Sequence, residues 1–556
     1  MMRYLLGGTA FGVILTLSGT SNTAMATCRN LSENSQPIVL CNSENINDVL
    51  QPPGGNPFTV LDAPQNTIIF RDQFENNGEL FVLNGRDTSV DTLIFESTAD
   101  VSQTSIYLLD GNDSVTIHDS AQLSRTTLID TGEGDDTLTN EGIAGDVVMG
   151  GGNDTVTNID RLDNLDTGSG DDVVTNSGDM EFIEMGSGSD QFTNSGTIEA
   201  IVLGTDGDGL DGADSFSNTA LVDGNVTTGE GDDMIINERT INGSIFAGKG
   251  NDTITLTNAQ TQAIVRGEDG LGGFNQFAID GGEGLDTLIL EGTVDGLLSD
   301  VNTIGNVEAI EKRGSATWTL QQNPNTVSPG SATFTGGVTV HEGTLNFRRF
   351  DNGVDQQILV IQSDITNYGS ITGDVALSDN GHTFSNRVGS GSTGTVSANV
   401  SFGSGDDTFI NAGIIRPSPT TELSDGLSAG EGIHLNDGDD TFVNTGFVQG
   451  GVSLDGGADR FLMETTDLFG MGTGLVLGGA DIDTIVLGGN GGTLMEINTA
   501  SSSIREFESL EIDSTGRWNF SSNLDFDNDI ILTNGELEIN TDITAANLVV
   551  NGGWSI

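Results

Sequence analysis

Aspartates in glycine-rich turns are the residues of this sequence whose type and spacing best suit chemistry. Segments such as GEGDDTLTN, which starts at Gly132, and GSGDDVVTN, which starts at Gly168, recur along the chain. If such turns stack, carboxylates and backbone carbonyls of neighbouring copies could supply the roughly six to eight oxygen ligands that Ca²⁺ prefers. The candidate calcium ligands are the last acidic residues of the turns: Asp136, Asp154, Asp172, Asp190, Asp233, Asp252, Asp286, Asp407 and Asp440.

A structural interpretation of the same turns needs no metal. Like charges stacked about 4.8 Å apart repel by roughly 0.9 kcal/mol per pair in water, which a cation or solvent could accommodate. Asn153 and Asn251 replace the first acidic residue in two copies and relieve part of that repulsion. The sequence therefore leaves two hypotheses open, calcium sites and solvated structural turns, and the second requires no cofactor.

The histidines give little support for catalysis. The chain has four of them: His118, His341, His382 and His434. His382 occupies the position that aspartate takes in other repeats, which predicts a degenerate turn, and His434 is predicted to point outward from a strand between two apolar residues. The sequence has no HExxH motif and no serine triad with informative spacing. We expect no enzymatic activity, with a β-helical polysaccharide lyase or hydrolase as the alternative.

The turns belong to a longer repeat that predicts the fold. From Asp113 to Asp252, each final aspartate follows its predecessor by 18 to 24 residues, with an apolar residue two positions later and usually an asparagine four positions later. Short runs of alternating apolar residues lack helical periodicity, and the unit is too short for a propeller blade. The sequence predicts an all-β solenoid, a parallel β-helix with about 18–24 residues per coil and some 22 coils. Apolar side chains would point inward, and asparagine amides would hydrogen-bond between coils.

The amino terminus predicts export. Residues 1–26 have the features of a secretory signal peptide: Arg3, a mostly apolar stretch, and a cleavage site ending at Ala26. Cys28 and Cys41 follow directly, and an even cysteine count in an oxidising compartment favours a disulfide between them. The alternative, a metal or redox pair, lacks further ligands nearby.

Composition limits the partners. The 556 residues include 82 Asp and Glu against 18 Lys and Arg, a formal charge of −64. Binding to nucleic acid draws on clustered basic residues, whereas the two lysines, Lys249 and Lys312, stand far apart. The sequence therefore excludes nucleic acid as an expected partner.

A longer duplication predicts the domain organisation. The segments NVEAIEKRGSATW and REFESLEIDSTGRW end at Trp318 and Trp518, and Glu308 and Glu508 precede these tryptophans by the same spacing. The expected parts are a signal peptide (1–26), an amino-terminal cap with the first coils (27–100), and two β-helix modules (101–347 and 348–556). Longer spacings predict loops that could bind a ligand, at residues 205–213, 266–280, 321–331 and 416–432.

Over roughly residues 100–556, the sequence resembles passenger regions of bacterial autotransporters. The resemblance rests on alternating NSGTI, GSGDD and DTF blocks, followed by the tryptophan segment and GGVTVHEGTL. It implies a right-handed β-helical passenger that is secreted through the periplasm to the surface of a Gram-negative cell or into the extracellular space. There it would act in adhesion or surface interaction, with an unknown ligand. It also implies an outer-membrane translocator barrel. Because the sequence ends in passenger-like repeats, LVVNGGWSI, the barrel is expected in a missing part of the chain or as a separate polypeptide.

The turns also resemble the GGxGxDxUx nonapeptide of calcium-binding β-rolls. Residues 281–289, GGEGLDTLI, fit that pattern in full, but most copies lack its first glycine and none repeats in tandem every nine residues. This resemblance implies an alternative function, a secreted calcium-binding protein similar to β-rolls.

Overall fold

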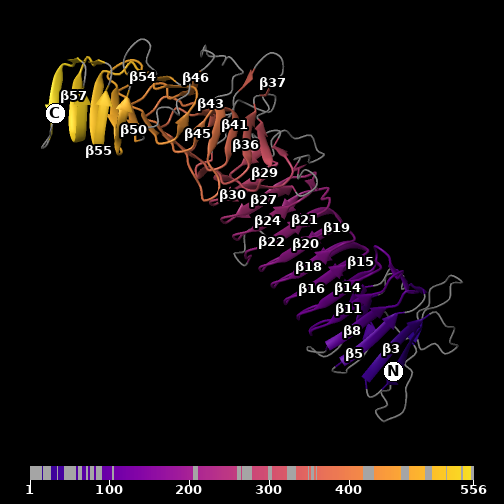
Figure 1. Cartoon of the computed structure of the whole chain (residues 1–556). Coiled ribbons are helices and arrows are strands. Elements are labelled where there is room, and N and C mark those ends of the chain that lie inside the picture. The colour runs from indigo at the N-terminus through magenta and orange to yellow at the C-terminus, as the bar shows by residue number, and fades with distance from the viewer. Residues whose placement is uncertain are drawn as a thin grey trace. The chain divides into compact units, whose positions relative to one another are not determined.

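The computed structural model (Figure 1) describes most of the chain after residue 89. The described ranges there are 90–102, 105–204, 211–258, 264–265, 278–298, 303–321, 334–348, 350–351, 356–357, 360–416, 431–464, 475–494, 497, 504–520, 523–539 and 542–551. Before residue 90 it describes the strands 15–16, 27–33, 36–42, 58–59, 65–70, 73–75 and 80–82.

The described residues form an all-β structure of parallel strands stacked as a β-helix, which confirms the expected class. Within the described ranges, no helix has the length and hydropathy needed to cross a membrane.

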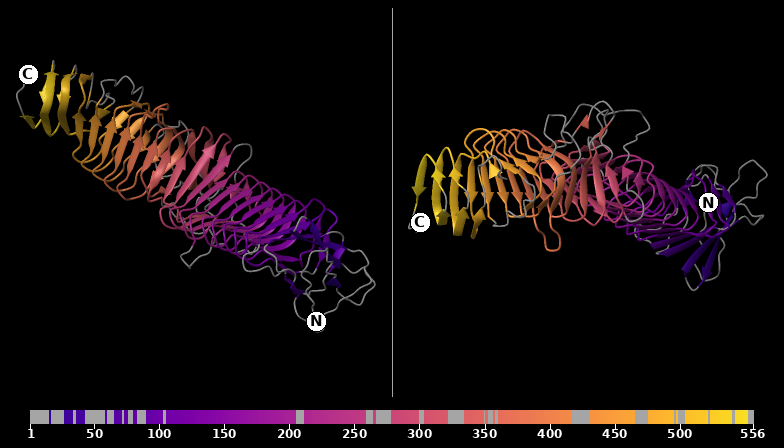
Figure 2. Two further views of the ribbon diagram at one scale, coloured as in Figure 1. Left: turned by 90° about the horizontal axis from the view of Figure 1, so that it is seen from below. Right: turned by 45° about the horizontal axis from the view of Figure 1, so that its top comes forward.

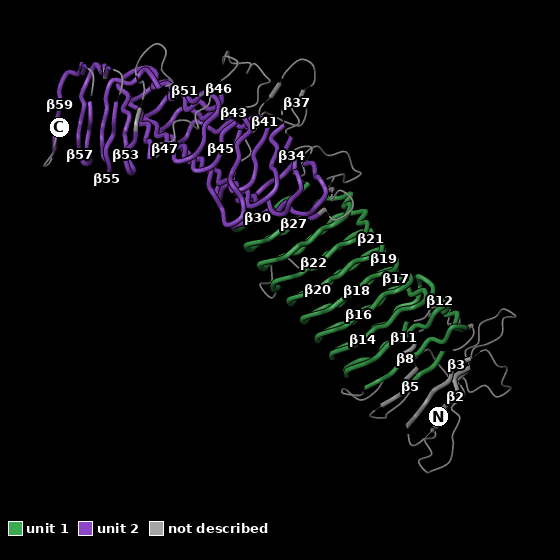
Figure 3. The backbone as a smooth tube through the Cα atoms, viewed as in Figure 1, with its two compact units in different colours: residues 1–255, 263–284 green, residues 256–262, 285–556 purple. Residues whose placement is uncertain are grey.

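Backbone contacts divide the chain into two compact units (Figure 3). Unit 1 comprises Met1–Thr255 with Ala263–Gly284, and unit 2 comprises Leu256–Gln262 with Leu285–Ile556. This division falls before the module boundary predicted between residues 347 and 348, and both tryptophan segments lie in unit 2.

Unit 1 is built from two parallel sheets, so that each regular coil contributes one strand to each sheet (Figures 1 and 2). The first sheet contains β8 (Val90–Phe95), β11 (Ser114–Ile117), β14 (Thr137–Asn140), β16 (Thr155–Asn158), β18 (Val173–Asn176), β20 (Gln191–Asn194), β22 (Ser215–Asn218) and β24 (Met234–Asn237). The second contains β10 (Ser105–Tyr107), β13 (Leu128–Asp130), β15 (Ile143–Val148), β17 (Arg161–Asp166), β19 (Asp179–Glu184), β21 (Thr197–Val202), β23 (Val226–Thr227), β26 (Ile245–Lys249) and β29 (Ile279–Glu283).

Unit 2 repeats this plan with longer strands at its carboxyl end. One sheet contains β30 (Thr287–Gly292), β33 (Ala309–Lys312), β35 (Gly337–Val340), β40 (Ile365–Asn367), β42 (Thr383–Asn386), β44 (Thr408–Asn411), β47 (Thr441–Asn444), β50 (Arg460–Met463), β52 (Thr484–Leu487), β55 (Ser509–Phe520), β57 (Asp529–Ile539) and β59 (Asn547–Val550). The other contains β31 (Gly296–Leu298), β34 (Thr317–Gln321), β36 (Thr344–Arg348), β41 (Ser370–Leu377), β43 (Thr395–Ser401), β46 (Glu431–His434), β49 (Gly451–Ser453), β51 (Leu475–Leu477) and β54 (Ile504–Arg505).

Strand register places equivalent repeat residues directly above one another. Leu138 pairs with Val156, and Val156 with Val174, so these coils are 18 residues long. Phe409 pairs with Phe442, a longer step because this coil contains the 416–432 insertion.

Columns of apolar side chains fill the interior. The residue two positions after each final aspartate is buried, as at Leu138, Val156 and Phe192. Aromatic members stack on one another: the ring centroids of Phe192 and Phe216 are 5.5 Å apart, and they pack nearly parallel. Each coil thus adds the same small set of inward-pointing side chains to the core. A chain poor in aromatic residues can therefore bury its apolar side chains by repeating this set along the axis.

Glycines before the aspartates allow the tight corner that the sequence predicts. Gly134 has a φ of +141°, in a region that residues with a Cβ rarely adopt. A Cβ at Gly134 would also lie 1.9 Å from the carbonyl oxygen of Gly111 in the preceding coil. Close coil stacking and the backbone angle therefore both require glycine here.

The amino-terminal predictions are only partly covered. The signal-peptide segment lies outside the described residues except for the short strand β1 (Leu15–Thr16). Strand β2 (Thr27–Glu33) pairs antiparallel with β3 (Gln36–Asn42) and places Cys28 opposite Cys41. Directly opposed residues of antiparallel strands lie at a backbone separation that a disulfide can bridge, and the bond itself stays a prediction. Most residues of the four predicted binding loops also lie outside the described ranges.

Candidate functional site

The final aspartates of the turns form a continuous ladder of hydrogen bonds, here called the inner ladder. In unit 1, Oδ1 of each aspartate accepts the backbone N–H of the equivalent aspartate in the preceding coil. Asp136 N–H donates to Asp154 Oδ1 at 2.7 Å, and Asp154 N–H donates to Asp172 Oδ1 at 2.7 Å. The same bond joins the consecutive members Asp91, Asp113, Asp136, Asp154, Asp172, Asp190, Asp214, Asp233 and Asp252.

The carboxyl groups of this ladder are buried. Asp154 is 1% exposed and Asp172 is fully buried. In Asp113, Asp154, Asp190 and Asp214 the second oxygen, Oδ2, is also buried and has no hydrogen-bond partner in the structure. An ionised carboxylate in such a place would carry a large desolvation cost.

Burial therefore raises the pKa of these groups. Desolvation, reinforced by neighbouring ladder aspartates, raises the pKa of Asp113, Asp154 and Asp190 to about 8, against the lowering effect of the accepted N–H bond. The same causes raise the pKa of Asp214 to about 9. At neutral pH these groups are mostly neutral carboxylic acids, with Oδ1 accepting the N–H bond and a proton available for Oδ2.

In some coils, a threonine five positions before the ladder aspartate reduces the rise in the pKa of that aspartate. The hydroxyl of Thr131 favours the ionised form of Asp136, and that of Thr167 favours the ionised form of Asp172. Desolvation still dominates, so the pKa of both aspartates rises, but only to about 6. Asp154 has Met149 at the equivalent position.

A second ladder, the outer ladder, runs in the opposite direction through the residue before each inner aspartate. Asn153 N–H donates to Asp135 Oδ1 of the preceding coil at 2.9 Å, and Asp171 N–H donates to Asn153 Oδ1 at 3.0 Å. These side chains are exposed. Each turn thus donates its inner N–H to the following coil and its outer N–H to the preceding coil.

Asparagines form a third ladder, which confirms the predicted bonding between coils. Nδ2 of each asparagine donates to Oδ1 of the next, at 2.7 Å from Asn158 to Asn176 and 2.8 Å from Asn176 to Asn194. These side chains are fully buried. Buried amides satisfied in this way fix the coil register, because a slip of one residue would break every bond in the column.

In unit 2 the inner ladder is shorter and ends on glutamates. Asp407, Asp440 and Asp459 bond in sequence, and Asp459 N–H donates to Asp483. Glu508 Oε2 then accepts Asp483 N–H at 2.8 Å, and Glu308 Oε2 accepts Asp286 N–H at the same distance. The glutamates of the two duplicated segments therefore replace the ladder aspartate, a role that sequence spacing alone did not reveal.

The structure brings the predicted calcium ligands together as these ladders, and each predicted ligand lies in an inner-ladder position. Among the described residues, no group of three or more His, Cys, Asp or Glu side chains has an arrangement that could hold a metal ion. The carboxylates bond to backbone N–H groups. Calcium binding stays a prediction that only titration can decide.

The histidines differ from expectation in part. His382 takes the aspartate position, as predicted, since its N–H donates to Asp407 Oδ1 at 2.6 Å. The expected outward exposure of His434 is wrong: it is 2% exposed, and Asp455 Oδ2 lies 3.2 Å from its Nδ1. His434 lies within a sheet, paired with Ser401 on one neighbouring strand and with Ser453 on the other, and these strands bury it.

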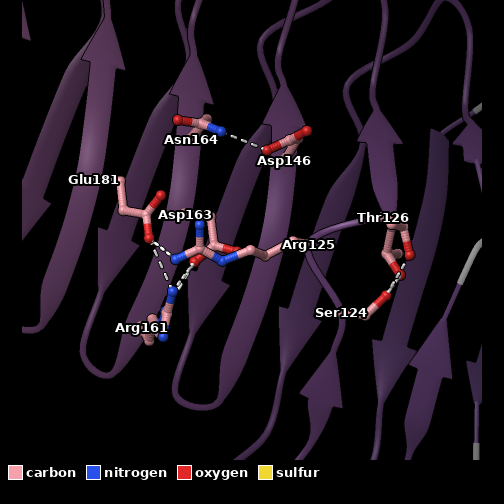
Figure 4. Close-up of polar contacts among 9 residues, drawn as sticks. Ser124, Arg125, Thr126, Asp146, Arg161, Asp163, Asn164 and Glu181 are labelled. Carbon is pink, nitrogen blue, oxygen red and sulfur yellow. Dashed lines mark hydrogen bonds and ion pairs between the residues drawn. The ribbon is translucent and has the colours of Figure 1, made fainter.

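A cluster of opposite charges on unit 1 was missed by the repeat analysis (Figure 4). Arg161 donates to Asp163 Oδ1 through Nε at 2.8 Å and to Glu181 Oε1 through Nη2 at 2.9 Å. Arg125, from an earlier coil, forms ion pairs with the same two carboxylates. These residues lie at the edge of an open groove lined also by Met180, Glu199 and Asp223.

No matching family model, curated protein or solved structure was found for this chain.

The charged groove presents an exposed arginine beside a buried carboxylate. Arg125 is 62% exposed, whereas Asp163 is 3% exposed and holds the two guanidinium groups in place. Sequence reasoning missed the cluster because Arg125 and Glu181 are 56 residues apart and lie outside the repeated turn.

Proposed function

We propose that this chain is an exported, autotransporter-like passenger. It would be delivered by an outer-membrane translocator to the surface of a Gram-negative cell or to the medium, and it would serve as a β-helical scaffold for adhesion or surface interaction.

The observation that carries this proposal is the repetition of outward-facing positions on the sheets. In β14, β16 and β20, burial alternates along the strand, so that two side chains of each strand point outward. Parallel pairing without register shift repeats those positions from coil to coil. Contacts repeated about every 4.8 Å suit an extended or multivalent ligand, for which many weak contacts add up to firm attachment.

The negative charge of the chain favours cationic ligands for such a surface. The formal charge of −64 favours cationic partners and opposes close packing of the protein against anionic surfaces. The groove beside Arg125 and Arg161 adds a place where both signs of charge are presented.

The test has two parts. The full chain is produced in a Gram-negative host, and cleavage after Ala26 and protease accessibility on intact cells are measured. Purified protein without residues 1–26 is then coated on beads, and attachment to epithelial cells and to charged abiotic surfaces is scored against salt concentration. Retention of an uncleaved chain in the cytoplasm, or beads that attach no better than albumin-coated beads, would overturn the proposal.

The loops predicted from the sequence are the other candidate for adhesion. Removing residues 205–213, 266–280, 321–331 and 416–432 together separates them from the sheet faces: loss of attachment with unchanged β-sheet circular dichroism would assign adhesion to the loops. Attachment that survives the removal of all four would assign adhesion to the sheet faces instead.

Calcium binding is the second candidate, favoured by the buried Oδ2 atoms of Asp113, Asp154, Asp190 and Asp214, which have no hydrogen-bond partner. A bound cation would neutralise these oxygens at alkaline pH in place of protons. If calcium binds there, chelation should lower the melting temperature at pH 8 and added Ca²⁺ should restore it. Identical melting with and without chelator, together with no heat of binding, would reject this candidate.

A further inference from the structure

The one coil of unit 2 in which histidine replaces the ladder aspartate has an unusual polar arrangement. His382 is 9% exposed, and its Nε2 lies 2.7 Å from Ser378 Oγ. Its other ring nitrogen, Nδ1, lies 3.9 Å from Asp364 Oδ1. A serine hydroxyl, an imidazole and a carboxylate are thus arranged in that order.

Backbone bonds position all three residues. Ser378 directly follows β41, and its N–H donates to Ile361 O at 3.1 Å. The backbone N–H of His382 is held by Asp407 Oδ1, as described above. Asp364 directly precedes β40, and its Oδ1 accepts the N–H of Thr383 at 2.7 Å. The arrangement is thus set by coil stacking and not by one flexible loop.

This order of groups is the one that activates a serine. A nucleophilic hydroxyl needs a base within hydrogen-bond reach, and the base needs a third group that orients its other nitrogen and stabilises its protonated form. The distance from Ser378 to His382 meets the first requirement. The distance from His382 to Asp364 is longer than a hydrogen bond, and such contacts are often long before substrate binds.

The site is open to solvent on one side. Ser378 is partly exposed, and the three residues between it and His382, Asp379 to Gly381, are exposed. Carboxylates near the site include Asp364, which is 65% exposed, and Asp379, Asp406 and the buried Asp407. This excess of negative charge disfavours anionic substrates.

We propose that Ser378, His382 and Asp364 form a hydrolytic site for small neutral or cationic carboxylic esters, an activity beyond the scaffold function. Ser378 Oγ attacks the ester carbonyl carbon while His382 Nε2 takes the hydroxyl proton. The bond from carbon to the alcohol oxygen then breaks, and the alcohol leaves with that proton. Water, deprotonated by His382, cleaves the acyl-serine bond, which releases the carboxylic acid and restores Ser378.

A structural explanation predicts different behaviour. If the bond from Ser378 to His382 only closes the turn, Ser378 has the reactivity of an ordinary surface serine. Covalent labelling separates these cases, because a fluorophosphonate reacts with activated serines and displaces fluoride.

The experiment uses the purified chain without residues 1–26, with a fluorophosphonate and 4-nitrophenyl acetate as probes. We expect one adduct, located on Ser378 by peptide mass spectrometry, and hydrolysis that falls by at least about 100-fold in Ser378→Ala. Ser370→Ala, a change at the start of the same strand, is the matched control and should retain both signals. Absence of the adduct, or equal hydrolysis by wild type and Ser378→Ala, would overturn the proposal.

His382→Asp gives a second variant that should fold. Aspartate is the residue of the other coils at this position, so the melting temperature should be retained while labelling and hydrolysis are lost. Hydrolysis by a folded His382→Asp variant would contradict the role of the base.

Asp364 is a positioning residue in this proposal. Asp364→Asn should lower kcat by about 10-fold or more with little change in KM, and should shift the acidic limb of the pH–rate profile. A residue with only a structural role would change the melting temperature and leave that profile in place.

Discussion

The inner ladder is uninterrupted in unit 1, whereas in unit 2 it is broken and capped. From Asp91 to Asp252 every member in unit 1 is an aspartate. In unit 2 a glutamate ends the run at Glu308 and again at Glu508, and His382 stands where the second run begins. The turn therefore requires an acceptor for the backbone N–H, and aspartate or glutamate can supply it. His382 is the ladder position without a carboxylate, and it is the position at which we propose a hydrolytic site.

The two units also differ in how strongly burial perturbs their carboxyl groups. In unit 1, four ladder aspartates have a pKa of about 8 or 9. In unit 2, burial raises the pKa of Asp440 to about 8, but those of Asp459 and Asp483 only to about 7 and that of Asp407 to about 6. The longer ladder thus holds more protons near neutral pH, and the two units should respond differently to alkali.

The largest expected effect is a loss of stability as pH rises. The folded ladder retains protons that the unfolded chain releases above about pH 4, so this stabilisation is fully present below about pH 4 and is lost as pH rises through about 8. Each fully shifted group contributes a slope of about 1.4 kcal/mol per pH unit. We expect the melting temperature to fall by at least about 10 °C between pH 5 and pH 8 in the presence of chelator.

Hydrogen exchange measures the loss of stability with rising pH separately in each unit. After correction for intrinsic rates, amides of the turns around Asp154 and Asp190 should lose more protection between pH 5 and pH 8 than those around Asp459 and Asp483. Equal losses, or a protein that is most stable at pH 8 without added cation, would contradict the protonated ladder.

Breaking the asparagine ladder should have a similar effect in both units. Asn176→Ala removes the bond to Asn194 and the bond from Asn158, whose amide keeps only its longer bonds to backbone carbonyls, at a cost of about 2–4 kcal/mol. Asn411→Ala in unit 2 should cost about the same, since Asn411 bonds in the same way. Chemical denaturation measures both, with the exposed Thr175→Ala as control. A cost below about 1 kcal/mol would mean that the ladder contributes little.

Removing the charge from one ladder carboxyl group should stabilise the protein in alkali. Asp154→Asn keeps the Oδ1 acceptor but cannot ionise, so at pH 8 it should be more stable than wild type by about 1 kcal/mol or more, and nearly unchanged at pH 5. Asp172→Asn should gain less, because Thr167 already lowers the pKa of Asp172. A destabilising effect of Asp154→Asn at pH 8 would instead support a bound cation.

The smallest effect is expected at the glutamate that ends the second run. Glu508→Ala removes the acceptor of the Asp483 N–H and should cost about 1 kcal/mol, whereas Glu508→Gln keeps an acceptor and should stay close to wild type. Equal melting temperatures of all three proteins would show that this bond is replaced by water.

The fold could be predicted from the sequence because its main constraints repeat. The apolar residue at Leu138, the amide at Asn140 and the glycine at Gly134 recur at a fixed spacing, and the pairing of coils follows from stacking like on like. The site was predicted less well. Aspartate spacing indicated a column, but the protonation of Asp154 depends on its burial, which becomes visible only in three dimensions.

Contacts between residues of different coils could not be predicted from the sequence either. Arg125 meets Glu181 only because coils stack, and no local motif announces that contact. Likewise, Ser378 and His382 are close in sequence, but Asp364 joins them from the preceding coil.

The opposite directions of the inner and outer ladders bear on how such a chain is completed. In a partly formed stack, the last coil offers an unsatisfied N–H for the next inner aspartate and an unused outer carboxylate for the next N–H. Each added coil fills both and creates the same pair again one step further on. Growth from the amino end is therefore templated, because the exposed end of a partial stack accepts a correctly aligned successor and leaves a misaligned one with two unmet bonds.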